Sequence, residues 1–158
     1  MLHLSPTIAV INNIDFEHIE CYNDIDDLKD TFLQFANSVP FYGTVCACKD
    51  SNNVASILSK IDKPIITYGI ESQNVDIKAE NLHQENGTIS FDVKVKDQIF
   101  SVNLSVPGKY NAYNALAALS VCETMGIDLE SACKALSNFS GVKPVSYTHL
   151  TLPTKVRV

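Results

Sequence analysis

The pattern of apolar residues changes along this chain. Short apolar runs separated by a helical pattern come first and indicate an α/β part, and strict alternation of apolar and polar residues follows and indicates a β-rich part. The run TIAVINNI (residues 7–14) is almost continuously apolar, as is typical of a strand buried on both faces of a parallel sheet. Residues 43–48 and 64–68 have the character of further short strands, and residues 53–61 between them have that of a helix. Strands separated by helices predict parallel pairing with right-handed crossovers.

An earlier segment, residues 26–43, begins with a helical pattern. Its apolar positions and the residue just before it form a stripe at helical spacing: Ile25, Leu28, Phe32, Phe35 and Ala36. We expect these side chains to belong to the core and not to contact a cofactor.

The pattern changes to strict alternation further along the chain. Residues 88–95 and 100–106 alternate apolar and polar positions, which predicts strands with one buried face. Asn86-Gly87 is a strong hairpin turn and Lys96-Asp97 a reasonable second one, so these strands form an antiparallel meander.

Two helices are expected to close the domain. One begins near Lys109, after Pro107-Gly108, covers about residues 110–125 and ends at Gly126; the other follows Asp128. The predicted fold class is therefore α/β: a mostly parallel sheet flanked by helices, with an antiparallel β-meander.

Composition narrows the class of protein without identifying it. With 158 residues, 46% of them hydrophobic, the chain can bury one core, so it is a single domain or part of one. A net charge of −6 argues against a nucleic-acid or membrane-surface partner. No apolar run approaches the ~20 residues that span a bilayer, and the N-terminus does not resemble a signal peptide. These features agree with a cytoplasmic enzyme and add little more.

The five cysteines are too scattered for a disulfide framework: Cys21, Cys46, Cys48, Cys122 and Cys133. Cys46 and Cys48 share one face of a predicted strand, but no second pair has metal-ligand spacing. Buried free thiols that behave as small hydrophobic side chains are the expected state.

Asn111 and Asn114 are the first candidates for chemistry. They lie three residues apart in the first turn of a predicted helix and therefore on one face. An amide offers both a donor and an acceptor, which is what the edge of a purine base requires. The alternative is that both side chains only cap the helix and bond local backbone.

A polar cluster after the first strand is the second candidate. It consists of Asp15, Glu17, His18 and Glu20, and ligands of open α/β sheets bind just beyond the carboxyl ends of strands. Imidazole and carboxylates can bind a divalent metal. Taken alone, such a cluster is more often a solvated loop.

Both segments resemble signature motifs of the Mur ligase family, the ATP-dependent amide ligases that build the peptide stem of peptidoglycan. The segments are GKYNAYNALAAL (residues 108–119) and NNIDFEHIECY (residues 12–22). The resemblance implies adenine contact for Asn111 and Asn114, and also for Tyr110, where one branch of the family usually has His. It implies that His18 helps to bind a Mg²⁺ or Mn²⁺ ion at the ATP phosphates, with Asn13 and Glu17 as local support. It assigns no catalytic residue to this chain.

The stretch DDLKDTFLQFANSVPFYG (residues 26–43) resembles one branch of the family, which joins L-alanine to UDP-N-acetylmuramate through an acyl phosphate. Murein-peptide recycling ligases share the helix, but the PFYG turn argues against them. The alternatives are another Mur-type amino-acid ligase, or a stand-alone nucleotide-binding or interaction module that has kept the fold and lost the chemistry.

The resemblance also predicts where the domain is cut. The sequence contains no G-x-x-x-x-G-K-[ST] loop, so nothing in it would hold the β and γ phosphates of ATP. We expect residues 1–142 to be the C-terminal half of the central, P-loop-type ATP-binding domain, with Met1 an internal methionine, and the isolated fragment to be inactive. Residues 143–158 lie outside that domain, and the tail from Pro144 resembles translated adapter sequence; an ordinary β extension is the alternative.

Overall fold

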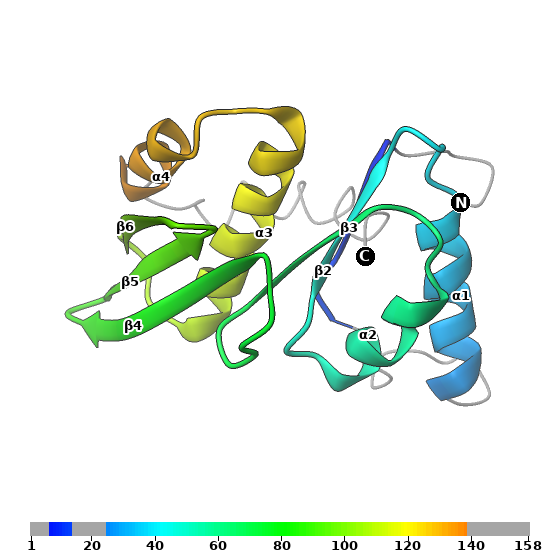
Figure 1. Cartoon of the computed structure of the whole chain (residues 1–158). Helices are drawn as coiled ribbons and strands as arrows, with labels where there is room; N and C mark the ends of the chain where they lie inside the picture. Colours follow the sequence, from blue (N-terminus) through cyan, green and yellow to red (C-terminus); the bar gives the residue numbers. More distant parts are fainter. Residues whose placement is uncertain (1–6, 14–24, 139–158) are drawn as a thin grey trace, which may run out of the picture.

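The computed structural model describes residues 7–13 and 25–138, whose strands form one six-stranded sheet with the sequential order β1-β2-β3-β4-β5-β6 (Figure 1). The strands are β1 (Ile8–Ile11), β2 (Thr44–Cys48), β3 (Ile65–Gly69), β4 (Ile77–Glu85), β5 (Thr88–Val95) and β6 (Gln98–Leu104). The helices are α1 (Ile25–Asn37), α2 (Asn52–Ile57), the 3₁₀ helix η1 (Leu58–Lys60), α3 (Lys109–Met125) and α4 (Leu129–Asn138).

The sheet changes direction at β4. Strands β1 to β4 pair in parallel, whereas β4, β5 and β6 pair as antiparallel neighbours. The parallel contact between β3 and β4 is short, with two residue pairs, Tyr68 with Ile77 and Gly69 with Lys78. The mixed sheet confirms the predicted fold class.

Helices cover both faces of the parallel strands, and β2 shows how the sequence specifies this. Val45 and Ala47 point into the core under α1 and α2, while Cys46 and Cys48 point into the core under α3. Successive side chains of a strand face opposite ways, so an unbroken apolar strand has a core on each side. Figure 1 shows α1 and α2 on one side of the strands and α3 on the other, with α4 beside the antiparallel strands.

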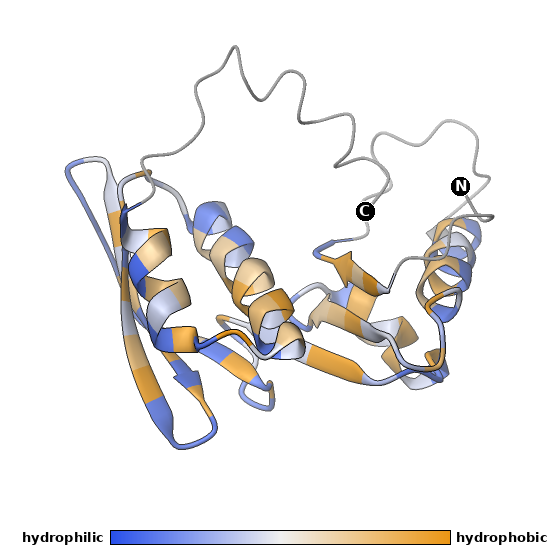
Figure 2. Ribbon diagram, turned by 90° about the horizontal axis from the view of Figure 1, so that it is seen from above, coloured by the Kyte–Doolittle hydropathy of each residue, from blue (hydrophilic) through white to orange (hydrophobic). Residues whose placement is uncertain are grey.

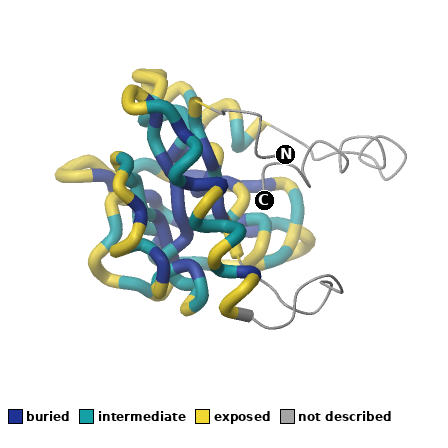
Figure 3. The backbone as a smooth tube through the Cα atoms, turned by 90° about the vertical axis from the view of Figure 1, so that its right-hand side faces the viewer, coloured by how far each residue is buried: buried dark blue, intermediate teal, exposed yellow. Residues whose placement is uncertain are grey.

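Most of the predicted core positions are confirmed. Leu28, Phe35 and Ala36 of α1 are buried, and Phe32 packs against them in a half-buried position. Cys46, Cys48 and Cys133 are buried free thiols, as expected of small hydrophobic side chains. Figure 2 shows hydrophobic residues along the parallel strands and on α3, and Figure 3 shows the deepest burial along the central strands.

Helix α3 begins and ends where the sequence predicts. Gly108 precedes it with φ +102° and Gly126 follows it with φ +75°, conformations that side chains with a Cβ rarely adopt. The predicted helix 53–61 is shorter: α2 ends at Ile57 and the 3₁₀ helix η1 follows. Ile61 then closes that turn through its backbone N–H.

The polar cluster with Asp15, Glu17, His18 and Glu20, and the tail 143–158, lie outside the described residues. Within the described ranges, no helix is both long enough and apolar enough to cross a membrane.

Candidate functional site

A cavity of about 340 Å³ lies beyond the carboxyl ends of β1 and β2, beside the first turns of α3. Three segments line it: Asn12 and Asn13 after β1; Cys48, Asp50 and Ser51 at the end of β2; and Tyr110, Tyr113 and Asn114 of α3. This is the edge of a parallel sheet at which α/β proteins bind ligands. Residues from distant parts of the sequence meet here because the parallel strands end together.

The start of α3 is fixed by the loop before it. The Gly108 N–H donates to the Gln84 side chain of β4 over 3.0 Å, and the Asn111 N–H donates to the Gly108 carbonyl over 3.0 Å. The Lys109 ammonium, at the first position of the helix, bonds the Glu71 carboxylate in the β3–β4 loop. The aromatic and amide side chains of the first turns therefore project from a fixed helix end.

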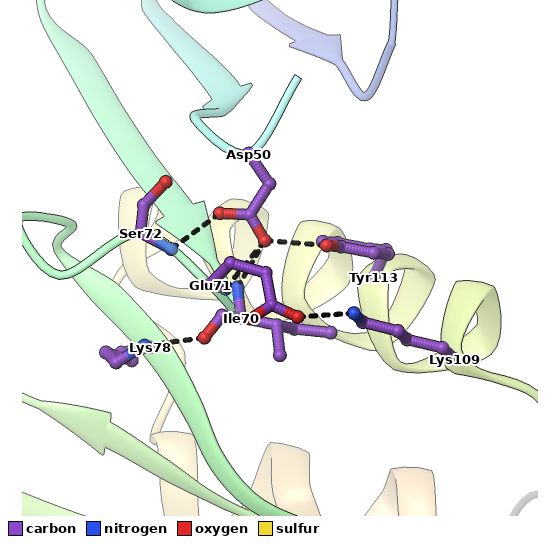
Figure 4. A network of polar contacts seen from close by, with 7 residues as sticks. All are labelled: Asp50, Ile70, Glu71, Ser72, Lys78, Lys109 and Tyr113. Atoms are coloured by element: carbon purple, nitrogen blue, oxygen red, sulfur yellow. Dashed lines mark hydrogen bonds and ion pairs between the residues drawn. The ribbon is translucent and has the colours of Figure 1, made fainter. Parts of the chain in front are cut away.

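Asp50 lies at the centre of a network of polar contacts (Figure 4). Its carboxylate accepts backbone N–H bonds from Ile70 at 2.7 Å, Glu71 at 2.9 Å and Ser72 at 2.8 Å, all in the β3–β4 loop. It also accepts a 2.6 Å bond from the Tyr113 hydroxyl of α3. Partial burial raises the pKa of Asp50, but these hydrogen bonds outweigh burial and hold it below the usual range.

The two amides after β1 are also held. The Tyr68 hydroxyl donates to the Asn12 side-chain oxygen, and the Ser51 hydroxyl donates to the Asn13 side-chain oxygen over 3.0 Å. Ser51 Oγ in turn accepts the Val54 N–H and caps α2. Side chains from β3 and from the residues after β2 therefore hold the segment that follows β1.

The described lining of the cavity is poorly suited to a metal ion. The only carboxylate among the described lining residues, Asp50, accepts four hydrogen bonds, three at Oδ2 and one at Oδ1, so most of its acceptor capacity is already used. Burial raises the pKa of the Cys48 thiol, so it is not a ready thiolate ligand at neutral pH. No group of three or more His, Cys, Asp or Glu side chains suited to a metal occurs within residues 7–13 and 25–138.

The sequence-predicted site residues have different positions. Asn114 and Tyr110 line the cavity, and Tyr110 is 69% exposed, with its ring open to a ligand. Asn111 is not among the lining residues, because its side-chain N–H donates to the Pro107 carbonyl over 2.7 Å. His18 lies outside the described residues, so its metal role stays a prediction.

Sequence reasoning assigned no site role to five lining residues: Asn12, Cys48, Asp50, Ser51 and Tyr113. Asp50 and Ser51 follow β2 directly, and the rule that ligands bind beyond the ends of parallel strands could have indicated them. Tyr113 lies between Asn111 and Asn114, where an aromatic residue is equally well explained as core.

The sheet order and its flanking helices define an α/β domain with a cavity beyond the carboxyl ends of its parallel strands. The family model of the Mur ligase middle domain matches residues 1–122, more than half of the chain, and the chain therefore belongs to the Mur ligase family. The resemblance seen in the sequence motifs is confirmed.

Two curated relatives give the same result in sequence. The chain is 46% identical over 138 residues to the UDP-N-acetylmuramate–L-alanine ligase of Persephonella marina, covering 87% of this chain and 29% of that protein. It is 44% identical over 142 residues to the ligase of the same name from a Sulfurihydrogenibium species, covering 90% and 30%. The chain thus spans about 30% of the length of these relatives.

Solved structures agree on the fold. The MurF ligase of Acinetobacter baumannii superposes with a TM-score of 0.79 at 20% identity, covering 90% of this chain and 31% of that one. The UDP-N-acetylmuramate–alanine ligase MurC of Thermotoga maritima gives 0.73 at 22% identity, covering 89% and 31%.

Proposed function

We propose that this chain is the adenine-binding half of the central domain of a ligase that joins L-alanine to UDP-N-acetylmuramate at the expense of ATP. The observation that carries the proposal is the cavity that unites Asn114 and Tyr110 of α3 with the ends of β1 and β2. The names of the curated relatives support the choice of amino acid and sugar nucleotide.

The cavity chemistry matches a purine base. The Asn114 amide offers a donor and an acceptor, the combination that the adenine edge complements. The exposed Tyr110 ring provides a face on which a base can stack. Asn111, for which the sequence motif also implied adenine contact, is bonded to the Pro107 carbonyl and does not line the cavity, so the proposal rests on Asn114 and Tyr110.

The phosphates of ATP would extend away from this cavity, since its described lining carries the negative charge of Asp50 and no ammonium or guanidinium group. His18 would help to hold the Mg²⁺ or Mn²⁺ ion, which when bound neutralises charge on the transferring phosphoryl group. In the complete enzyme, a carboxylate oxygen of UDP-N-acetylmuramate attacks the γ-phosphorus and ADP leaves. The L-alanine amine then attacks the acyl phosphate, forming the amide and releasing phosphate.

Nucleotide binding can be tested on the 158-residue chain itself. Saturation-transfer NMR at millimolar Mg-ATP detects weak binding, and we expect transfer to the adenine protons. Asn114→Ala should weaken binding about five- to tenfold through the loss of one or two hydrogen bonds. Asn103→Ala, an exposed amide on β6 that does not line the cavity, is the matched control. No transfer from the wild-type chain, or equal losses in both variants, would contradict the proposal.

The ligase reaction requires more of the protein than this chain. We expect no alanine-dependent ADP release from the 158 residues, because the phosphate-binding loop is absent from the sequence. Sequencing the parent DNA across both ends of the reading frame, then assaying the longer product, tests this. Release of ADP by the short chain alone would overturn it, whereas tight Mg-ATP binding without turnover in the longer product would favour a stand-alone nucleotide-binding module.

A further inference from the structure

The Asp50–Tyr113 pair lies in the cavity wall, and the proposed function gives it no role. Both side chains line the cavity, and the Tyr113 hydroxyl donates to the Asp50 carboxylate over 2.6 Å. Tyr113 lies one residue before Asn114, so whatever fixes its ring also fixes the first turns of α3 at the cavity. Figure 4 shows the Tyr113 ring extending from α3 toward Asp50.

Asp50 cannot easily move, because three successive backbone N–H groups hold its carboxylate. These come from Ile70, Glu71 and Ser72, at distances between 2.7 and 2.9 Å. The Tyr113 hydroxyl is therefore bonded to a fixed acceptor. Asp50 follows β2 in the sequence, and its carboxylate is held by the β3–β4 loop.

A second contact joins the β3–β4 loop to the start of α3. Glu71, whose N–H bonds Asp50, also bonds the Lys109 ammonium through its side chain. Lys109 begins α3, and Tyr113 lies one turn later. The β3–β4 loop thus holds the first turn of α3 at two points, directly through Glu71 and indirectly through Asp50.

We infer that Asp50 is a positioning residue for the nucleotide site, acting through Tyr113, and this inference rests on the proposed function. It holds the Tyr113 ring and the adjoining Asn114 in the arrangement that receives a base. Because the aromatic wall is ordered before binding, the ligand does not have to order it. With its proton donated to Asp50, the Tyr113 oxygen can only accept from a ligand, which favours a base with an exocyclic amino group, such as adenine.

The test is a mutant cycle on the 158-residue chain with Mg-ATP and saturation-transfer NMR. Tyr113→Phe removes only the hydroxyl, and Asp50→Asn removes the charge while keeping the shape. We expect each to weaken ATP binding about three- to tenfold, within the range for the net contribution of one typical hydrogen bond. In the double variant, the Tyr113 change should have no further effect, since both act through one contact.

Two controls match these changes. Tyr42→Phe removes a phenol hydroxyl from an exposed ring of the turn before β2, and Asp128→Asn alters the carboxylate that caps α4; neither residue lines the cavity. Both should bind ATP as the wild type does. A second readout is base selectivity: Tyr113→Phe should reduce the preference for ATP over inosine triphosphate, which a role confined to stability would leave unchanged.

The outcomes separate the two proposals. If Asn114→Ala weakens ATP binding while Tyr113→Phe and Asp50→Asn change only thermal stability, the positioning role is wrong and the nucleotide site stands. If the two variants weaken binding additively, Asp50 does not act through Tyr113 and the inference fails. If the wild-type chain binds no ATP, the proposed function fails and this inference falls with it.

Discussion

The Tyr113 hydroxyl donates to Asp50 across 2.6 Å, although 63 positions of sequence separate the two residues. This bond connects the end of a parallel strand to the first turns of the helix that crosses the sheet. Because the same carboxylate accepts three N–H bonds from the β3–β4 loop, three segments of the chain meet at one side chain. The stability of the domain and the shape of the cavity therefore depend on the same group.

Acid should weaken the domain through Asp50. The pKa of this carboxyl in the folded protein lies below its ordinary value of 3.8, so its contribution to stability is present above that pH and is lost as the pH falls toward the folded-state pKa. Urea unfolding of the wild type and Asp50→Asn should differ by a constant amount above about pH 5 and by less at lower pH. A difference independent of pH would show that the carboxylate is not held in this way.

Asn111 and Asn114 should separate into two roles. Asn111→Ala removes a 2.7 Å bond to the Pro107 carbonyl and should lower the free energy of unfolding by about 1 kcal/mol. Asn114→Ala, at an exposed position, should change it by less than about 0.5 kcal/mol while weakening ATP binding. Both changes replace Asn by Ala near the start of α3, so the effect of helix propensity cancels when the two variants are compared. Equal thermal stabilities of the two variants would contradict this division.

Gly69 should be intolerant of a side chain. A Cβ at this position would lie 2.5 Å from Asp50 Oδ1, so Gly69→Ala must displace the carboxylate and should cost about 1–3 kcal/mol of stability. The expected signature is a shift of the Ile70, Glu71 and Ser72 amide resonances. Gly87→Ala is the control for the resonances, because no atom lies within 4 Å of an added Cβ there; its φ of +78° is unfavourable for alanine, so it will lower stability without displacing Asp50. Unchanged resonances in Gly69→Ala would refute the expected displacement.

The buried thiols should react slowly with alkylating reagents. Burial raises the pKa of Cys46 and that of Cys133 to about 11 each, so little thiolate exists at neutral pH and little of either sulfur is accessible. Cys122 is only half-buried and should be modified earlier. Mass spectrometry of peptides after timed iodoacetamide treatment measures the order. Modification of Cys46 as fast as Cys122 in the native protein would contradict the burial.

Local signals explain which parts of the fold the sequence predicts. The start of α3 at Lys109 follows from Pro107-Gly108 and the Ala-rich run after it, and the strands β5 and β6 follow from strict alternation. The sequence does not delimit strand β4, because IKAENLHQE is largely polar and Asn81 has φ +56° near a shift of register between Glu80 and His83. Strand β4 forms through its pairing with β3 and β5, and its own sequence has no clear alternation of apolar and polar residues.

The site was predictable only where its residues carry a local sequence signal. Asn114 and Tyr110 belong to one short motif with recognisable helical spacing, and both line the cavity. The Asp50–Tyr113 contact has no such signal, since it arises only when β2, the β3–β4 loop and α3 come together. Asn111 has the same residue type and helical face as Asn114, yet its bond to Pro107 depends on the loop before the helix, which spacing does not specify.

The short parallel contact between β3 and β4 has a consequence for the order of folding. The β4-β5-β6 meander is built from contacts between neighbours in sequence, which form early, whereas the parallel strands must wait for their crossovers. Only two residue pairs join these halves of the sheet, Tyr68 with Ile77 and Gly69 with Lys78. Docking of the two halves is then a late event, and Asp50, next to Gly69, lies where it is completed. The cavity beyond β1 and β2 would be the last part of the domain to acquire its shape.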